Sequence, residues 1–245
     1  MEDIARFTGM PEIKRQSLFH ALNQKAVSLK AADTLGKKYN ELNLIVAHLG
    51  GGISVGVHHL GRVIDVNNAL DGDGPMSPER SGGVPIGPLY KMAISGDYTL
   101  KQIKRKNYGN GGMVAYLGTN DGFEIEKRIN EGDEFAKFIL EVMCYQVSKE
   151  IGSAATVLKG QVDAIIITGG LAYDSFIISD ITSRVSFIAP LLIFPGEDEM
   201  EALAFGALRV LKGEEIAKTY YRAYLELNLA LARVITIKNS IKPFR

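Results

Sequence analysis

The strongest constraint on the fold is a run of three short strands interrupted by glycine. An apolar strand is predicted at Leu44–Ala47, and it leads into the glycine-rich segment His48–Gly52. A second strand is predicted at Ile53–Val57 and, after a turn through residues 58–61, a third at Arg62–Val66. Consecutive glycines permit tight bends and bring backbone N–H groups close to an anion. The segment therefore predicts adjacent strands around a phosphate-binding loop.

The rest of the chain indicates an α/β fold. After the three strands come several helices, a strand that is apolar throughout, a helix, another strand and a last helix. This order predicts a mixed sheet, with antiparallel hairpins first and parallel crossovers later. The predicted helices are Ser17–Leu35, Gly87–Ser95, Leu100–Lys106, a long one to Lys159 capped by Asp133, and Asp198–Leu211, and the two later strands are Val162–Thr168 and Ser186–Phe194.

Composition excludes several classes of protein. The chain has 28 Lys+Arg and 28 Asp+Glu, so its zero net charge gives no basic field for nucleic acid. Its longest apolar run, Val185–Phe194, contains Pro190 and is far shorter than the ~20 residues that span a bilayer. Cys144 is the single cysteine, is expected to be buried and inert, and permits no internal disulfide. With an N-terminus that has no signal-peptide character, this predicts a cytoplasmic protein.

Two glycine turns end strong strands, at His48–Gly52 and at Thr168–Ala172. In open α/β sheets, ligands bind beyond the carboxyl ends of the strands. Two such turns in one sheet could hold opposite ends of a nucleotide, one at the phosphates and one at the nucleoside. The alternative is that each turn only reverses the chain.

Arg80 is a candidate for charge stabilisation. It stands among proline, serine and glycine residues, where neither a helix nor a strand explains it. Its fork of N–H donors could bridge a carboxylate and a phosphoryl group. The alternative is a salt bridge to Asp71, Asp73 or Glu79.

Two of the four histidines are candidates for a role at the site. His48 lies beside the glycine loop and His20 lies at the start of a helix, so both could donate to a reacting group, although a structural role is also open. His58 and His59 fall in the predicted hairpin turn and are expected to be solvated.

Four polar residues could contact a nucleotide or its metal. Asp198 or Glu199 could hold Mg²⁺ through water, or could simply favour the start of the last helix. Asn120 and Asp121 could bond a ribose or base, or could form an Asx turn.

Long strings of the sequence resemble the family of acetate and butyrate kinases. They are HLGGGIS, GRVIDVNNALDGDGPMSPERSGGVP, GNGGMVAYLGTND and ITGGLA, and the similarity runs over Ala5–Glu215. The resemblance implies an actin-like, ribonuclease-H-like ATPase fold with two domains around a nucleotide cleft. It implies reversible transfer of the ATP γ-phosphoryl group to a short-chain carboxylate, here butyrate, with ATP/ADP and Mg²⁺ as cofactors. A sugar kinase or heat-shock ATPase would share the glycine turns but not the string around Arg80.

The resemblance also implies roles for individual residues. It assigns the phosphates to His48, Leu49, Gly50, Gly51 and Gly52, the adenosine side to Gly169, Gly170, Leu171, Ala172 and Tyr173, the transferring phosphoryl group to Arg80 and His20, and Mg²⁺ to Glu199.

The resemblance covers the C-terminal two-thirds of the family's pattern. We expect residues 1–43 to be a helical lead-in from a truncated first domain, 44–215 the C-terminal nucleotide-binding domain, and 216–245 an atypical tail. The family's Asn-Pro-Gly-Ser loop, substrate-binding arginine and catalytic aspartate have no counterpart in the chain. The expected alternatives are an inactive or partner-dependent fragment, with a separately encoded N-terminal half, or a kinase for another short-chain acid. The full-length family is expected to form homo-oligomers.

Overall fold

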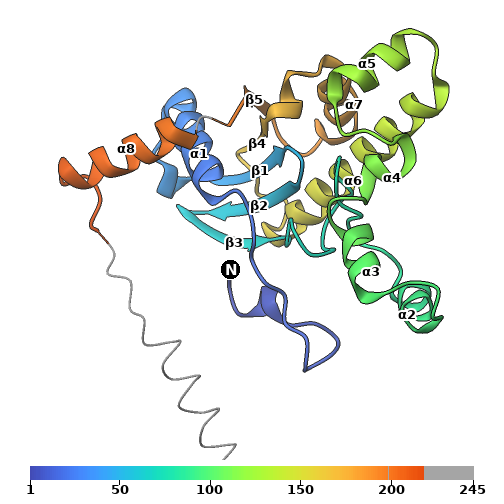
Figure 1. Ribbon diagram of the computed structural model, residues 1–245. Coiled ribbons are helices and arrows are strands. Elements are labelled where there is room, and N and C mark those ends of the chain that lie inside the picture. The colour runs from blue at the N-terminus through green and yellow to red at the C-terminus, as the bar shows by residue number, and fades with distance from the viewer. Residues whose placement is uncertain (198, 218–245) are drawn as a thin grey trace, which may run out of the picture. The chain divides into compact units, whose positions relative to one another are not determined.

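The computed structural model describes residues 1–197 and 199–217 (Figure 1). The chain divides into two compact units, Met1–Ala202 and Leu203–Arg245. Of the second unit, the described part is the rest of helix α8 (Glu199–Leu211) and a turn that an Arg209–Glu215 ion pair of 3.1 Å closes. The predictions for Asp198 and for most of the tail, residues 218–245, lie outside the described residues.

The first unit is built on a five-stranded mixed sheet, which confirms the predicted architecture. Strand order is β3-β2-β1-β4-β5. The β1–β2 and β2–β3 pairs are antiparallel, and the β1–β4 and β4–β5 pairs are parallel. The strands are β1 Asn43–Leu49, β2 Ile53–His59, β3 Arg62–Val66, β4 Ala164–Gly169 and β5 Leu191–Pro195.

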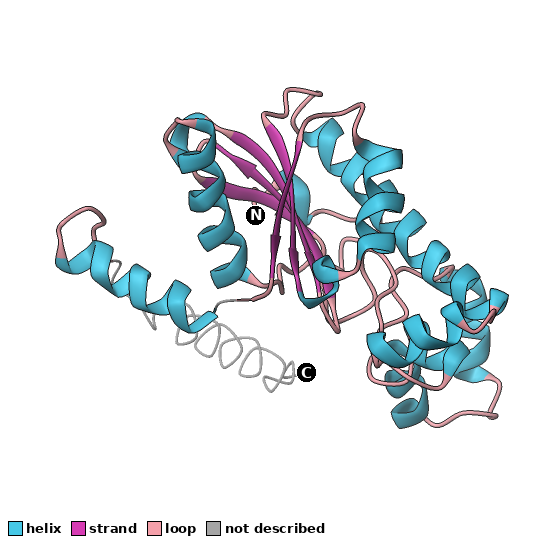
Figure 2. Ribbon diagram, turned by 90° about the horizontal axis from the view of Figure 1, so that it is seen from above, coloured by secondary structure: helices cyan, strands magenta, loops and turns pink. Residues whose placement is uncertain are grey.

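Helices cover both faces of this sheet, as Figure 2 shows. On one face lies α1 (Ala21–Leu35), which packs Val27 and Ala31 against Leu44 and Val46. The opposite face carries the larger core, in which α6 (Glu134–Val157) and α7 (Ser175–Val185) cover alternate residues of the same strands. The period of two along a strand explains this division. The remaining helical segments are η1 Ile4–Arg6, η2 Tyr39–Glu41, α2 Ile86–Ile94, α3 Leu100–Asn107, α4 Gly112–Leu117, α5 Gly122–Asn130 and η3 Gly170–Tyr173.

Two predicted helix starts are confirmed by their capping bonds. The Asp133 carboxylate accepts a hydrogen bond from the Ala136 N–H at 2.9 Å and begins α6. Thr99 and Gln102 form a capping box at the predicted start of α3. Cys144 is fully buried in α6, and this burial raises the pKa of its thiol to about 12, as expected of an inert cysteine.

Two sequence predictions are wrong in their boundaries. The first helix begins at Ala21 rather than Ser17, because the chain turns at Phe19, whose carbonyl accepts from the Ala21 N–H at 2.8 Å, and His20 is the N-cap. Ser186 ends α7, and β5 starts only at Leu191, after Pro190, which cannot donate to a ladder.

The predicted hairpin turn after β2 is also wrong, because both histidines belong to the strand. His58 and His59 pair with β1 and β3, and the turn itself is Leu60–Gly61. His58 is fully buried and hydrogen-bonded instead of solvated, because it faces α1. Across residues 1–197 and 199–217, every helix is too short or too polar to span a membrane.

Candidate functional site

The carboxyl ends of three parallel strands meet at one edge of the sheet. At the end of β4, Gly169 exchanges two backbone hydrogen bonds with Gly196, just beyond β5, at 3.0 and 3.1 Å. Gly169 has φ +94°, and a side chain at this position would overlap the backbone of Leu49 at the end of β1. The two glycine turns therefore touch, and their juxtaposition matches the general place of ligand binding in α/β sheets.

The segment that carries Arg80 lies directly on the first glycine turn. The Ser77 hydroxyl donates to the Gly51 carbonyl at 2.7 Å, and the Glu79 N–H donates to the same oxygen at 3.3 Å. The Arg80 guanidinium lies against Gly52, where any Cβ atom would overlap its nitrogen. Glycine at position 52 is thus required for the observed position of the Arg80 side chain.

Arg80 does not form the salt bridges with Asp71 or Asp73 that the sequence left open. Asp71 accepts a hydrogen bond from the Asn107 amide, and Asp73 pairs with Arg15 at 3.4 Å. The guanidinium of Arg80 donates to the Ala69 carbonyl. Partial burial lowers the pKa of Arg80, and the neighbouring Glu79 carboxylate opposes that shift. The remaining guanidinium nitrogens are donors of the kind that bind phosphoryl oxygens.

His20 and His48 form a stacked pair at the same edge. Their ring centroids are 3.7 Å apart with an interplanar angle of 12°. His48 is fully buried, and its Nδ1 lies 2.8 Å from the Asn23 side-chain oxygen. Burial, followed by the nearby His20 ring, lowers the pKa of His48 to about 3. His48 is therefore neutral at physiological pH.

The Nε2 atom of His48 points to an acidic neighbour. It lies 3.4 Å from Oε1 of Glu197, a half-exposed residue just after the β5 end. In the part of the chain that the structure describes, this nitrogen is buried and has no hydrogen-bond partner. A buried polar atom without a partner is unusual and marks a place for a bound group.

The second glycine turn continues into the single turn η3. Gly170 and Tyr173 are exposed, Leu171 is half-buried, and Ala172 is buried against the core. The exposed positions leave room for a ligand beside the Gly169–Gly196 contact.

Asn120 and Asp121 make different contacts. The Asn120 amide donates to the Glu79 carboxylate, so this residue joins the Arg80 segment. Asp121 caps α5 by accepting a hydrogen bond from the Phe123 N–H at 2.9 Å. For Asp121 the structure thus shows the Asx turn that the sequence left open.

The acidic residues of the candidate site suit only a metal ion whose other ligands are mostly waters and phosphate oxygens. The side chain of Glu199 lies outside the described residues. Among the described residues, no three His, Cys, Asp or Glu side chains gather as a metal-binding group. Mg²⁺ commonly uses one or two protein carboxylates with waters and phosphate oxygens, so the exposed Glu197 carboxylate fits that requirement.

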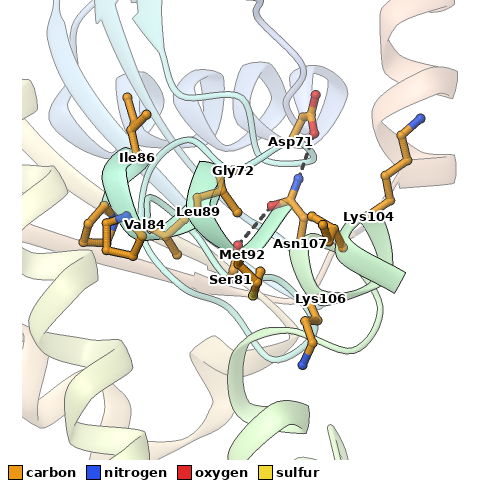
Figure 3. A pocket seen from close by; sticks show the side chains of 13 residues that line it. Asp71, Gly72, Ser81, Val84, Ile86, Leu89, Met92, Lys104, Lys106 and Asn107 are labelled. Atoms are coloured by element: carbon orange, nitrogen blue, oxygen red, sulfur yellow. Dashed lines mark hydrogen bonds between the residues drawn. The ribbon is translucent and has the colours of Figure 1, made fainter. Parts of the chain in front are cut away.

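A separate pocket of about 480 Å³ adjoins the Arg80 segment (Figure 3). Its walls are largely apolar and come from α2 and α3, for example Leu89 and Ile103. Ser81 belongs to this wall, and its hydroxyl lies 3.0 Å from the Asn107 side-chain oxygen. None of the residues predicted to bind the nucleotide lines this pocket. The contacts between Ser81, Asn107 and Asp71 support the Arg80 segment from outside the candidate site.

Several residues of the site were not found from the sequence, namely Asn23, Gln24, Ser54 and Glu197. One signal was available for part of this set. His20, Gln24 and Ser28 recur every four residues, which places them along one side of a helix.

Comparisons with known proteins agree on one family. The model of the acetokinase family matches residues 11–189. Butyrate kinase 2 of Clostridium acetobutylicum is 57% identical over 220 residues, which are 90% of this chain and 62% of that protein. The chain therefore spans less than two thirds of the length of this curated relative.

Solved structures show the same fold at low sequence identity. The acetate kinase of Porphyromonas gingivalis matches with a TM-score of 0.78 at 22% identity, covering 86% of this chain and 61% of that one. A propionate kinase of Francisella tularensis matches with a TM-score of 0.71 at 23% identity, covering 82% and 59%. These matches confirm the expected actin-like, ribonuclease-H-like fold. The family model matches most of the chain, and the butyrate kinase relative is 57% identical to it, so the chain belongs to the acetokinase family.

Proposed function

We propose that this chain carries the nucleotide side of a carboxylate kinase site. In the reaction, a carboxylate oxygen of the acceptor attacks the γ-phosphorus of ATP. The bond from this phosphorus to the β–γ bridging oxygen breaks, and its electron pair leaves with ADP, so that the products are an acyl phosphate and ADP. The observation that carries the proposal is the Arg80 guanidinium placed directly on Gly52 of the phosphate-loop candidate.

Phosphoryl transfer depends mainly on position and charge, because the protein forms no covalent bond in it. The Gly50 N–H donates to the Gly52 carbonyl at 3.2 Å and holds the turn, and the backbone N–H groups of Gly51 and Gly52 are proposed to supply fixed partial positive charge beside the β1 end. Arg80 adds a full positive charge at the same turn. This combination matches a group whose negative charge is spread over several oxygens.

His20 is the second candidate to contact the transferring group. It is half-buried and stacks on His48, so its ring plane is held by a neighbour that is itself fully buried. A donor that is already oriented stabilises developing charge without reorganisation during the reaction.

The nucleoside is proposed to lie at the second glycine turn. Gly170 is exposed there, Gly169 is buried and bonded to Gly196, and Leu171, Ala172 and Tyr173 form the adjoining turn. Mg²⁺, when bound, would neutralise phosphate charge, with Glu199 as the proposed ligand and Glu197 as a second carboxylate of suitable position.

Butyrate is the proposed acceptor. The relative with 57% identity carries the name butyrate kinase, and this supports the choice among short-chain acids. The acceptor is already ionised near neutral pH, since carboxylic acids of this kind have pKa values of about 4 to 5. The site therefore needs no strong general base, and none of its described histidines has to serve as one.

The first test measures nucleotide binding by the purified chain. Isothermal titration calorimetry with ADP and Mg²⁺ is expected to show saturable binding. Absence of binding by ADP and by ATP would overturn the assignment of the two glycine turns.

The second test separates the Arg80 contact from the loop itself. Gly52→Ala places a methyl group on the Arg80 guanidinium, whereas Gly83→Ala places one 3.6 Å from the Gly74 carbonyl oxygen, an ordinary contact distance. Acyl phosphate formation from ATP and butyrate, trapped as the hydroxamate, is expected to fall by roughly 10²-fold in Gly52→Ala. Gly83→Ala is the matched control outside the loop and is expected to retain the rate. Equal rates in the two variants would contradict the proposal.

A further inference from the structure

A ladder of polar side chains connects helix α1 to strand β2 beneath the candidate site. His20, Gln24 and Ser28 recur every fourth residue along α1, and they face Ser54, Gly56 and His58, which recur every second residue along β2. Four residues of a helix rise about 6 Å and two residues of a strand about 6.6 Å, so the two rows stay in step. All of these residues except His20 are buried.

The middle rung depends on Gly56. A Cβ atom at this position would overlap the side-chain oxygen of Gln24. The missing side chain leaves space for the Gln24 amide, which reaches both neighbours on the strand. Its nitrogen donates to the Ser54 carbonyl at 3.2 Å and to the Ser54 hydroxyl at 3.0 Å, and its oxygen lies 3.0 Å from Nε2 of His58.

These contacts fix the direction of each hydrogen bond. The Ser54 carbonyl can only accept, so the Gln24 nitrogen faces Ser54 and the Gln24 oxygen faces His58. His58 must then carry its proton on Nε2 and donate it to that oxygen. Its Nδ1 is left as an acceptor and receives the Tyr39 hydroxyl at 2.8 Å.

The same logic continues to His20. The Ser54 hydroxyl oxygen already accepts from Gln24, so its own proton is available for Nδ1 of His20 at 2.9 Å. With Ser54 as the donor, His20 accepts at Nδ1, and in its uncharged form the ring proton lies on Nε2.

The stacked partner is held in the opposite form. The Asn23 amide nitrogen donates to the Glu197 carbonyl at 3.0 Å, which turns its oxygen toward Nδ1 of His48. His48 must donate from Nδ1, and its Nε2 has only a lone pair. Two stacked rings thus present different atoms, one an N–H donor and one an acceptor.

We propose that Gln24, Ser54 and His58 are positioning residues that hold His20 as the Nε2–H tautomer, so that its ring can offer an N–H donor to the oxygens of the transferring phosphoryl group. The role of His20 in transfer rests on the proposed function. The tautomer itself does not, because it follows from hydrogen bonds within the chain. Tyr39 begins the chain of donors, and the ladder directs them all one way, from Tyr39 to His20.

The test reads the tautomer directly. The unaltered 245-residue chain has four histidines, and ¹⁵N-labelled histidine with long-range ¹H–¹⁵N correlation NMR shows which ring nitrogen is protonated. At mildly alkaline pH we expect His20 and His58 as Nε2–H tautomers and His48 as the Nδ1–H tautomer. Single histidine variants assign the signals. A wild-type His20 protonated on Nδ1 would overturn the inference.

A pair of variants tests the two supports separately. Ser54→Ala removes the donor to His20, so the His20 signals are expected to shift toward a mixture of tautomers while those of His48 stay. Asn23→Ala is expected to do the reverse. Ser54→Thr keeps a hydroxyl and should restore the Nε2–H form. An unchanged His20 tautomer in folded Ser54→Ala, checked by circular dichroism, would also overturn the inference.

The outcomes distinguish this inference from the proposed function. If the chain binds no nucleotide but shows the expected tautomers, the kinase role is contradicted and the ladder is supported. If the chain binds nucleotide but His20 is protonated on Nδ1, the ladder is contradicted and the nucleotide site is supported. If a variant fails to fold, the spectrum of the unaltered chain still decides.

Discussion

The two faces of the central sheet are both buried, yet they use different chemistry. The face toward α6 and α7 is lined by aliphatic residues such as Ile165 and Ile167, together with buried Met143 and Cys144 of α6. The face toward α1 has an apolar half and a polar half, the latter formed by the ladder from His20 to His58. Hydrocarbon contacts are non-directional, whereas hydrogen bonds fix the orientation of each group. The apolar face therefore supplies stability, and the polar ladder supplies orientation next to the candidate site.

The largest expected effect comes from a cavity in the apolar face. Ile151 of α6 is fully buried in the large core. Ile151→Ala is expected to lower the free energy of unfolding by about 2–5 kcal/mol, through lost transfer energy and an unfilled cavity. Urea denaturation measures this loss. NMR of the same variant should still show the Nε2–H form of His20, and a changed tautomer would remove the distinction between the faces.

Acid should act on the polar ladder before the apolar face. Burial lowers the pKa of His58 from 6.5 to about 4. As the pH falls, the unfolded chain therefore binds a proton at His58 before the folded chain does. The associated stability is complete above about pH 6.5 and is lost as the pH falls toward 4, a change of up to about 3 kcal/mol. His48 should contribute in the same direction, because its pKa is also lowered, to about 3.

The His58 part can be isolated by substitution. The free energy of unfolding is measured against pH for the unaltered chain and for His58→Gln, which has no titrating ring. The variant is expected to lose less stability between pH 6.5 and 4. Parallel curves for the two proteins would contradict a neutral, buried His58.

The smallest effect is expected at the outer end of the ladder. Tyr39→Phe removes the hydroxyl that donates to Nδ1 of His58, while the Ser28 hydroxyl remains 3.2 Å from that nitrogen. The expected loss in the free energy of unfolding is about 1 kcal/mol. Tyr116→Phe, at an exposed tyrosine, is the matched control. Equal small changes in both variants would show that the Tyr39 hydrogen bond adds nothing.

The sheet and the glycine turns could be predicted because their signals are local. Apolar runs and glycines determined four of the five strands to within a few residues, and Thr99 and Asp133 identified two helix starts. Periodicity alone failed at Ser186, since an apolar run such as the one before Phe194 reads alike in a helix end and a strand.

The candidate site was only partly predictable, because it depends on contacts between distant segments. His48 and Arg80 stood out by their neighbours in sequence. Gln24 and Ser54 are 30 positions apart in the sequence, where they look like ordinary polar residues. Only the packing of α1 on β2 buries both and brings them within hydrogen-bond distance. His58 was misplaced for the same reason, since the partner that buries it comes from another element.

The ladder between α1 and β2 makes the number of residues in these two elements more critical than many of their identities. One residue inserted between His20 and Ser28 would turn every later side chain of the helix by about 100°. One residue inserted between Ser54 and His58 would move His58 to the opposite face of the sheet. Insertions and deletions should therefore be far less acceptable in these two short stretches than in the loop after β3, even where each substitution within them is mild.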